Sequence, residues 1–153
     1  MEVDESNWRE CVKLEVDDAE KHYVDRNVFA IAEWKFEPEN KIRAIYSSSE
    51  LVGMLAYYYH DGYYGQFYWL YHLMIEQKHQ GRGYGQDAVN LAVKEMRALG
   101  ATDIVTSYHP ENARAKYIYG KLGFKDNGVL DGGDPFLILT AECAKQVIAS
   151  DNL

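Results

Sequence analysis

Three glycines within five residues mark the most informative segment of the sequence, Gln80-Gly81-Arg82-Gly83-Tyr84-Gly85. Glycine lets the backbone turn sharply and brings its amide groups close to a ligand. A predicted strand precedes the segment and a predicted helix follows it, so unpaired N–H groups and the positive end of the helix dipole lie at this point. Lys78 and Arg82 add positive charge to a chain that is otherwise acidic. The segment is therefore predicted to hold a phosphate or pyrophosphate rather than to form a plain turn.

Two other types of phosphate loop fit this segment less well. Gly83-Tyr84-Gly85-Gln86-Asp87-Ala88 satisfies a dinucleotide-binding fingerprint, but that fingerprint expects the first strand of a parallel sheet before it and an acidic residue at the end of the next strand. Here three strands of antiparallel character come first, and Asp103 falls at the start of the next strand. A kinase-type phosphate loop needs Gly-Lys-Ser/Thr after the glycines, which this segment lacks.

Tyr119 and His72 are polar side chains placed among apolar ones. Tyr119 lies on a predicted helix and shares an apolar face with Ala115, Ile118 and Leu122. On the residues alone it is either a core tyrosine or a proton donor. His72 lies in a strand that is nearly all apolar or aromatic. It is either a structural histidine or a base, because the pKa of histidine lies near neutrality.

Hydrophobic periodicity predicts the elements that must position these residues. We expect, in order, a helix capped by Ser6 or Asn7, a helix over 28–36, strands over 42–46, 51–60 and 66–76, an amphipathic helix that ends at Gly100, a strand over 103–108, a helix over 112–122, strands over 124–130 and 136–140, and a terminal helix over 141–149. The strand over 66–76 is expected to be central and covered on both faces. This order predicts an α/β sandwich on a mixed sheet.

Composition narrows the class of protein. The chain has 153 residues, which is room for a single domain over 1–153. Its 16 basic and 24 acidic residues give a net charge of −8, which repels nucleic acid and anionic membranes. It has no apolar run of membrane-spanning length and no signal peptide, and its two cysteines form neither a disulfide framework nor a zinc site. We expect a soluble, cytoplasmic protein that binds no nucleic acid, membrane or metal.

Two segments together resemble the GNAT superfamily of N-acyltransferases. Gln80-x-x-Gly83-x-Gly85, between a strand and a helix, is similar to the loop with which this family holds the pyrophosphate of acetyl-CoA. Asn112-Ala113-x-Ala115-x-x-x-Tyr119-x-Lys121-Leu122-Gly123-Phe124 resembles the family's second conserved helix. Within the superfamily the chain looks most like the bacterial spermine/spermidine (diamine) acetyltransferases. The resemblance implies an α/β (α+β) fold with a mixed, mostly antiparallel sheet flanked by helices, and acetyl transfer from acetyl-CoA to an amine.

The resemblance also implies roles in catalysis. Tyr119 takes the position of the acid that protonates the departing thiolate. In the polyamine enzymes an acidic residue on the central strand often serves as the base, but here Tyr71 stands at that position with His72 beside it. Neutral Tyr71 cannot act as a carboxylate base, and His72 reaches the same pocket only if the strand is bulged, because strand neighbours face opposite sides. Water held by Glu33, Glu76 or a backbone carbonyl is the alternative.

The same resemblance assigns the contacts with the cofactor. The backbone of Leu73, Met74 and Ile75 would bind the pantetheine arm, Asn112 would bind that arm across the cleft, and Lys121 would lie near the nucleotide. The pyrophosphate would be held by the glycine segment and the start of its helix, that is by Gln80, Gly81, Arg82, Gly83, Tyr84, Gly85 and Gln86.

The acceptor is predicted to be a small polyamine such as spermidine or spermine, contacted by Glu33 and Tyr71. Carboxylates pair with ammonium groups, so Glu33, Glu37, Glu39 and Asp61 could line a cation site or simply form a solvated face. The alternatives are the same chemistry on an antibiotic, an amino acid or a protein amino group, or a non-catalytic acyl-CoA-binding domain. The tyrosine-rich stretch 57–68 is either a plain hairpin or an aromatic wall, and together with the family habit it predicts a homodimer.

Overall fold

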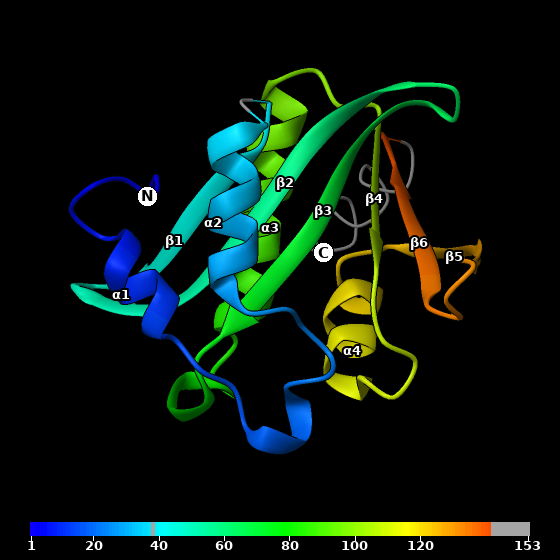
Figure 1. Cartoon of the computed structure of the whole chain (residues 1–153). Helices are drawn as coiled ribbons and strands as arrows, with labels where there is room; N and C mark the ends of the chain where they lie inside the picture. The colour runs from blue at the N-terminus through cyan, green and yellow to red at the C-terminus, as the bar shows by residue number, and fades with distance from the viewer. Residues whose placement is uncertain (38, 142–153) are drawn as a thin grey trace, which may run out of the picture.

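One six-stranded sheet with helices on both faces forms the part of the chain that the computed structural model describes, residues 1–37 and 39–141 (Figure 1). The elements, in chain order, are α1 (Trp8–Lys13), the 3-10 helix η1 (Asp18–Glu20), α2 (Asn27–Phe36), β1 (Lys41–Ser47), β2 (Glu50–Gly62), β3 (Gly65–Ile75), the 3-10 helix η2 (Gln77–His79), α3 (Tyr84–Ala98), β4 (Asp103–Ser107), α4 (Ala113–Lys121), β5 (Lys125–Val129) and β6 (Pro135–Thr140). The predicted order of helices and strands is confirmed. The terminal helix predicted over 141–149 lies, apart from its first residue, outside the described residues.

The strand order is β1-β2-β3-β4-β6-β5. Among the described strands, β3 and β4 form the one parallel pair, and the other neighbours are antiparallel. The mixed, mostly antiparallel sheet that the sequence predicts is therefore confirmed. So is the central place of β3, whose side chains pack into apolar clusters on both faces of the sheet, Leu70 on one and Met74 on the other.

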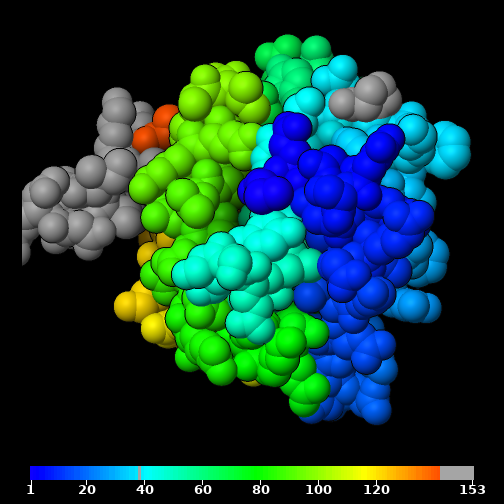
Figure 2. Space-filling view, turned by 90° about the vertical axis from the view of Figure 1, so that its left-hand side faces the viewer, coloured from blue at the N-terminus to red at the C-terminus, as the bar shows by residue number. Residues whose placement is uncertain are grey.

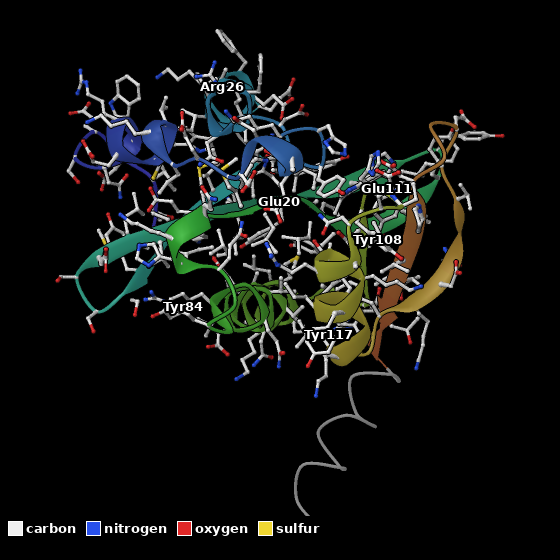
Figure 3. The ribbon with its side chains drawn as sticks, turned by 90° about the horizontal axis from the view of Figure 1, so that it is seen from below. Glu20, Arg26, Tyr84, Tyr108, Glu111 and Tyr117 are labelled. Atoms are coloured by element: carbon white, nitrogen blue, oxygen red, sulfur yellow. The ribbon has the colours of Figure 1, made fainter. Side chains whose placement is uncertain are left out.

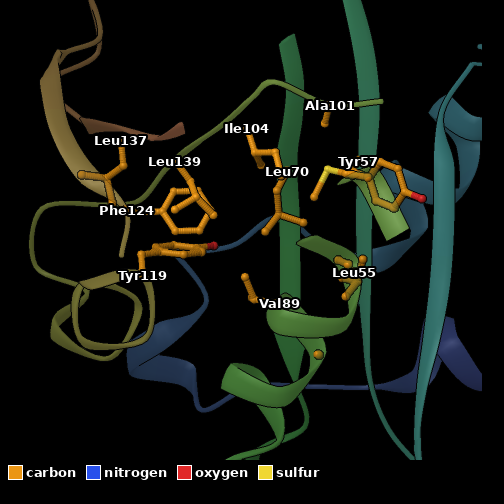
Figure 4. Packing of buried hydrophobic residues seen from close by; sticks show 13 residues of the cluster. Leu55, Tyr57, Leu70, Val89, Ala101, Ile104, Tyr119, Phe124, Leu137 and Leu139 are labelled. Carbon is orange, nitrogen blue, oxygen red and sulfur yellow. The ribbon is translucent and has the colours of Figure 1, made fainter. Parts of the chain in front are cut away.

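Two apolar clusters hold the layers together. On one face α1 and α2 contribute Cys11 and Ala30 to a cluster that includes Met54 and Met74 of the sheet. On the opposite face, α3 packs through residues spaced three and four apart, as expected of an amphipathic helix. Tyr119 of α4 joins this second cluster (Figure 4), whose other buried members are Leu55, Tyr57, Leu70, Ala88, Val89, Ala92, Met96, Ala101, Ile104, Phe124, Leu137 and Leu139.

The ends of two helices show how local chemistry sets their bounds. Gly100 follows α3 with a φ of 98°, a left-handed conformation that glycine adopts without strain, so the predicted C-terminal cap is confirmed. At α1 the expected cap is wrong in part. Asn7 is the N-terminal flanking residue, but its side chain makes no capping hydrogen bond. Its amide nitrogen donates to the carbonyl oxygen of Glu2 and its amide oxygen accepts from the N–H of Asp4.

The first residues of the described chain cover the outer edge of the sheet at β1. The N–H of Ala44 donates to the carbonyl oxygen of Met1 at 2.8 Å, and Glu2 forms an isolated bridge with Arg43. Figure 2 shows this segment lying beside the turn between β1 and β2, with α3 on its other side. Part of the β1 edge is therefore paired with this segment and is not free to bind another strand.

Candidate active site

Strands β3 and β4 separate near the middle of the sheet and leave a fork between them. They pair over only three residues, ending where Leu70 lies opposite Thr106, whereas β3 continues to Ile75. The Thr106 hydroxyl donates to the Leu70 carbonyl oxygen at 2.9 Å and lies at the base of the fork. Beyond this point no described strand pairs with this side of β3, as Figure 1 shows. A strand edge freed in this way can bind a peptide-like ligand through its backbone groups.

A cavity of about 300 Å³ opens at this fork. Its walls come from the loop after η1, from α2, from the end of β3 and from the segment between β4 and α4. It brings together many residues named from the sequence: Glu33, Tyr71, His72, Leu73, Met74, Ile75, Gln80, Asn112 and Tyr119. It also includes polar residues that the sequence did not single out: Glu20, Tyr23, Asp25, Tyr108, His109, Arg114 and Asp134.

A β-bulge at Tyr71 decides which way the central strand presents its polar side chains. Ala56 of β2 lies opposite His72 and Tyr57 lies opposite Leu70, so Tyr71 is an extra residue without a partner. Tyr71 packs against the cluster under α2, and His72 forms a hydrogen bond with Asn27 of the same helix. A bulge places neighbouring residues on one face where a regular strand would alternate them. The condition for Tyr71 and His72 to share a pocket is therefore met.

His72 is 5% exposed and is held by a buried hydrogen-bonded chain. The amide nitrogen of Asn27 donates to the carbonyl oxygen of Cys11 at 2.7 Å, so the amide oxygen of Asn27 must accept from Nε2 of His72, also at 2.7 Å. This leaves Nδ1 as the ring nitrogen with a free lone pair. Burial lowers the pKa of His72 to about 4, although the charge of Asp25 acts in the opposite direction. At neutral pH the ring is uncharged, and it is a weak base.

Tyr71 keeps its proton and stands next to a carboxylate. Its hydroxyl accepts a hydrogen bond from the side-chain amide of Asn40 at 3.3 Å. Burial raises the pKa of Tyr71 to about 12, and the negative charge of Glu33 adds to this effect. Glu33, on α2, is exposed and lines the cavity, whereas Glu37, Glu39 and Asp61 do not line it. Of the four carboxylates that could form a cation site, Glu33 is the one that the structure brings to the cavity.

Tyr119 reaches the cavity from α4 and is itself 5% exposed. Its ring packs edge-on against Phe124, with the centroids 5.4 Å apart, and its hydroxyl points toward β3 (Figure 4). Burial raises the pKa of Tyr119 above its ordinary value. The phenol therefore stays protonated at neutral pH. Tyr119 is therefore a core tyrosine that also lines the cavity, and its role as a proton donor stays a prediction.

The glycine segment has the backbone that an anion site requires. Gly81 and Gly83 have φ angles of 75° and 86°, which residues with a side chain rarely adopt. Gly85 is favoured for a different reason, because a Cβ there would lie 3.0 Å from the Ile118 side chain of α4, closer than an ordinary contact. No described side chain caps the start of α3, so its first N–H groups are available to a ligand.

Gln80 anchors this segment to three other parts of the cavity. Its amide nitrogen donates to the carbonyl oxygen of Ile75 at 3.0 Å and to Glu20 at 3.1 Å. Its amide oxygen accepts from Arg114, which also forms an ion pair with Glu20 at 2.9 Å. Sequence reasoning missed Glu20 and Arg114. Arg114 occupies an unassigned position inside the second quoted motif, but nothing local marks Glu20.

Other predicted cofactor residues lie at the margins of the cavity or turn away from it. The side chain of Tyr84 accepts a hydrogen bond from Ser47 at 3.0 Å and points away from the fork, so only its backbone faces a ligand there (Figure 3). Asn112 accepts from the N–H of Ala115 and so caps α4. Lys121 lies outside the cavity, with its Nζ 5.8 Å from the ring centroid of Tyr117.

The comparisons with known proteins decide the family. The model of the acetyltransferase (GNAT) family matches residues 8–124, which run from the start of α1 to the residue that precedes β5. The chain belongs to the GNAT family of acetyltransferases. It is an acetyl-CoA-dependent N-acetyltransferase, and acetyl-CoA is its co-substrate. None of the curated proteins matches the chain significantly.

Solved structures share this GNAT fold at low sequence identity. The aminoglycoside acetyltransferase AAC(6')-Ib in complex with coenzyme A is 15% identical, covers 97% of each chain and has a TM-score of 0.78. PaiA N-acetyltransferase from Thermoplasma acidophilum, also in complex with coenzyme A, is 18% identical over 74% of this chain and 69% of that one, with a TM-score of 0.61. An acetyltransferase from Thermus thermophilus is 19% identical over 88% and 82%, with a TM-score of 0.64. These comparisons do not single out the spermine/spermidine enzymes within the family.

Within residues 1–37 and 39–141, no helix is both long enough and apolar enough to cross a bilayer.

Proposed function

We propose that this GNAT enzyme acetylates a primary amine of a small polycation, with spermidine or spermine as the best candidate. The charge of the cavity wall carries the proposal. Glu20, Asp25, Glu33 and Asp134 line the cavity, whereas Arg114 is the one arginine or lysine among its described lining residues and is paired with Glu20. Such a wall attracts ammonium groups and repels acceptors that carry carboxylates or phosphates.

Glu33 and Tyr71 are the substrate contacts in this proposal. Glu33 is close enough to Tyr71 to raise the pKa of its phenol, so a bound ammonium at this point meets both a carboxylate and a neutral hydroxyl. Phe29, Tyr23 and Tyr108 add aromatic rings to the same walls. Aromatic faces attract cations, so these rings can attract the acceptor's ammonium groups even where no carboxylate pairs with them.

The cofactor residues named from the sequence fit acetyl-CoA. The freed edge of β3 offers the backbone of Leu73, Met74 and Ile75 to the peptide-like pantetheine arm. The uncapped start of α3, with the left-handed glycines before it, suits the pyrophosphate. Asn112 lines the same cavity, and Arg82 is the exposed cation within the segment. Lys121 would reach the nucleotide only from outside the cavity. Acetyl-CoA supplies an acetyl thioester and a thiol leaving group.

Two proton movements remain for the chain's own residues. An alkyl ammonium has a pKa near 10.4, so roughly one molecule in a thousand carries a free lone pair at neutral pH. His72, with a pKa of about 4, is too weak a base to hold that proton. We assign its Nδ1 the smaller task of accepting a hydrogen bond on the route by which the proton leaves to water. Tyr119 keeps its proton at neutral pH and can give it to the departing thiolate.

An acceptor panel tests the proposal. Purified protein is mixed with acetyl-CoA and one amine at a time, and the free thiol that is released is measured. We expect the highest kcat/KM with spermidine or spermine, and thiol release at least about a hundredfold slower with the Tyr119→Phe variant. Activity on amino acids or peptide amino termini, with none on polyamines, would refute the polyamine assignment.

A second acceptor class is an aminoglycoside antibiotic. The structure of AAC(6')-Ib with coenzyme A and kanamycin covers 97% of this chain and of its own, with a TM-score of 0.77. Kanamycin carries several ammonium groups, so the acidic wall would suit it as well. Kanamycin therefore belongs in the panel, and a higher kcat/KM for kanamycin than for spermidine would replace the first candidate.

Assembly and location complete the proposal. We infer a homodimer, supported by the exposed aromatic rings of Tyr63 and Tyr64 at the tip of the β2–β3 hairpin and of Phe36 on α2. Sedimentation equilibrium of the natural chain and of Tyr64→Ser measures this directly. The cytoplasmic location stays a prediction from the sequence.

A further inference from the structure

Three ligand-type side chains that the proposed acetyl transfer does not use lie together beside the cavity, and one of them, His109, also lines it. His22 comes from the loop after η1, and His109 and Glu111 come from the turn between β4 and α4. One ligand atom from each of the three lies within 4.8 Å of the other two. Nε2 of His22 is 3.7 Å from a carboxylate oxygen of Glu111. Figure 3 shows Glu111 close to the chain around η1, although the two segments are far apart in the sequence.

The two imidazoles are held in place by a third ring. Tyr23 packs against His22 with centroids 4.1 Å apart and against His109 at 5.1 Å. The two histidine rings meet edge to face at 5.1 Å. Nδ1 of His109 accepts from the N–H of Glu111 at 3.3 Å. This hydrogen bond is long, so a metal ion bound at either ring nitrogen would displace it at small cost.

We propose that His22, His109 and Glu111 bind a divalent transition metal ion of the zinc type. Two imidazoles and one carboxylate form the kind of donor set that Zn²⁺ accepts with a water in the fourth position. Hard cations such as Mg²⁺ prefer oxygen ligands only. Zinc bonds of 2.0–2.2 Å place neighbouring ligand atoms about 3.3 Å apart. The three ligand atoms, which lie within 4.8 Å of one another, would therefore need to approach each other by no more than about 1.5 Å.

The surroundings favour a bound cation over a plain surface ion pair. Asp25 lies at the end of the same loop, whereas Glu20 at its start is already paired with Arg114. Lys21, the cation beside His22, is engaged by Asp18 at 2.5 Å. The side chains of His22 and Glu111 are 52% and 73% exposed, so an ion can enter from solvent. An ion pair between two such exposed groups contributes little by itself, whereas a metal ion would use both groups together with His109.

Binding of the metal ion would join two segments that contribute to the cavity wall. Tyr23 and His109 both line that cavity, and the metal would join the loop after η1 to the turn before α4. We expect the bound metal ion to restrict the entry of the acceptor, and only this expectation rests on the proposed function. The metal site itself is independent of acetyl transfer, so its test does not depend on finding a substrate.

Cobalt titration tests the site directly. The tag-free full chain is treated with chelator, dialysed and titrated with Co²⁺, whose visible absorption reports nitrogen ligands and low coordination number. We expect one equivalent to bind with a dissociation constant below roughly 100 µM, and Zn²⁺ to displace it. His22→Ala and His109→Ala are each expected to weaken binding at least about tenfold, and Glu111→Gln to weaken it as well.

The matched control is His60→Gln, which removes a histidine that stacks on Phe67 elsewhere in the fold. It is expected to bind Co²⁺ as the natural chain does. Because the three ligands lie near the surface, circular dichroism of the variants is expected to match that of the natural chain. The proposal is overturned if no metal binds in this range, or if His22→Ala and His109→Ala bind Co²⁺ as tightly as His60→Gln does.

Discussion

Lowering the pH from about 7.5 to about 5 is expected to cost the folded protein about 2 kcal/mol of its free energy of unfolding through His72 alone. The ring is buried, and its folded pKa of about 4 lies well below the value near 6.5 of the unfolded chain. Between these two values the unfolded chain binds a proton that the folded protein does not. The contribution is therefore fully present above pH 6.5 and is lost as the pH falls toward 4.

The magnitude follows from the width of that window. Each pH unit in which only the unfolded state is protonated changes the free energy by about 1.4 kcal/mol, and about one and a half units lie between 6.5 and 5. The carboxylates of Asp4, Asp18 and Glu95 have pKa values lowered by their hydrogen bonds in the folded protein. In the folded protein these carboxylates titrate below pH 5, so they do not account for the predicted change in the free energy of unfolding.

Urea unfolding, followed by tryptophan fluorescence at a series of pH values, measures the effect. His72→Gln keeps a side-chain N–H that can donate to Asn27 but cannot titrate, so its stability should fall by about 2 kcal/mol less than that of the natural chain between the two pH values. His22→Gln, which removes an exposed histidine, is the matched control and should follow the natural chain. Equal losses in the natural chain and in His72→Gln would refute the buried, neutral state of the ring.

The remaining predictions concern the roles proposed for the site. Tyr119→Phe should keep its affinity for coenzyme A, measured by calorimetry, and lower kcat by about 10²–10⁴-fold; an unchanged kcat would remove Tyr119 from the mechanism. Gly83→Asp should abolish coenzyme A binding in the same calorimetric experiment, because it places a side chain and a negative charge at a φ of 86° in the proposed pyrophosphate site; retained affinity would show that the segment is not the pyrophosphate loop. Glu33→Gln should raise KM for spermidine about tenfold and leave KM for acetyl-CoA unchanged, whereas Glu37→Gln, a neighbouring exposed carboxylate that does not line the cavity, should change neither.

The acceptor amine, and not His72, is expected to set how the activity depends on pH. Because the pKa of His72 is about 4, kcat/KM should rise with pH toward the pKa of the acceptor amine, with no inflection near 6.5. A stopped series of thiol-release assays from about pH 6 to about pH 9 checks this. An inflection near 6.5 that His72→Gln removes would restore histidine as the general base.

Short-range patterns in the sequence determined the glycine segment, its flanking strand and helix, and the helix that carries Tyr119. Glycine spacing and apolar periodicity are properties of adjacent residues, so they predict a local backbone whatever the rest of the chain does. The left-handed φ angles of Gly81 and Gly83 and the buried face of α4 agree with those predictions. The family followed from the same two segments.

Only the tertiary structure decided which side chains line the cavity and how they interact with one another. The bulge at Tyr71 depends on how β3 pairs with β2, and that register is set by contacts between residues far apart in the chain. Arg114 meets Glu20 across 94 positions of sequence, and no local pattern can predict such a pair. Burial likewise decides that the pKa of His72 falls to about 4, because the cost of charging a group depends on everything packed around it.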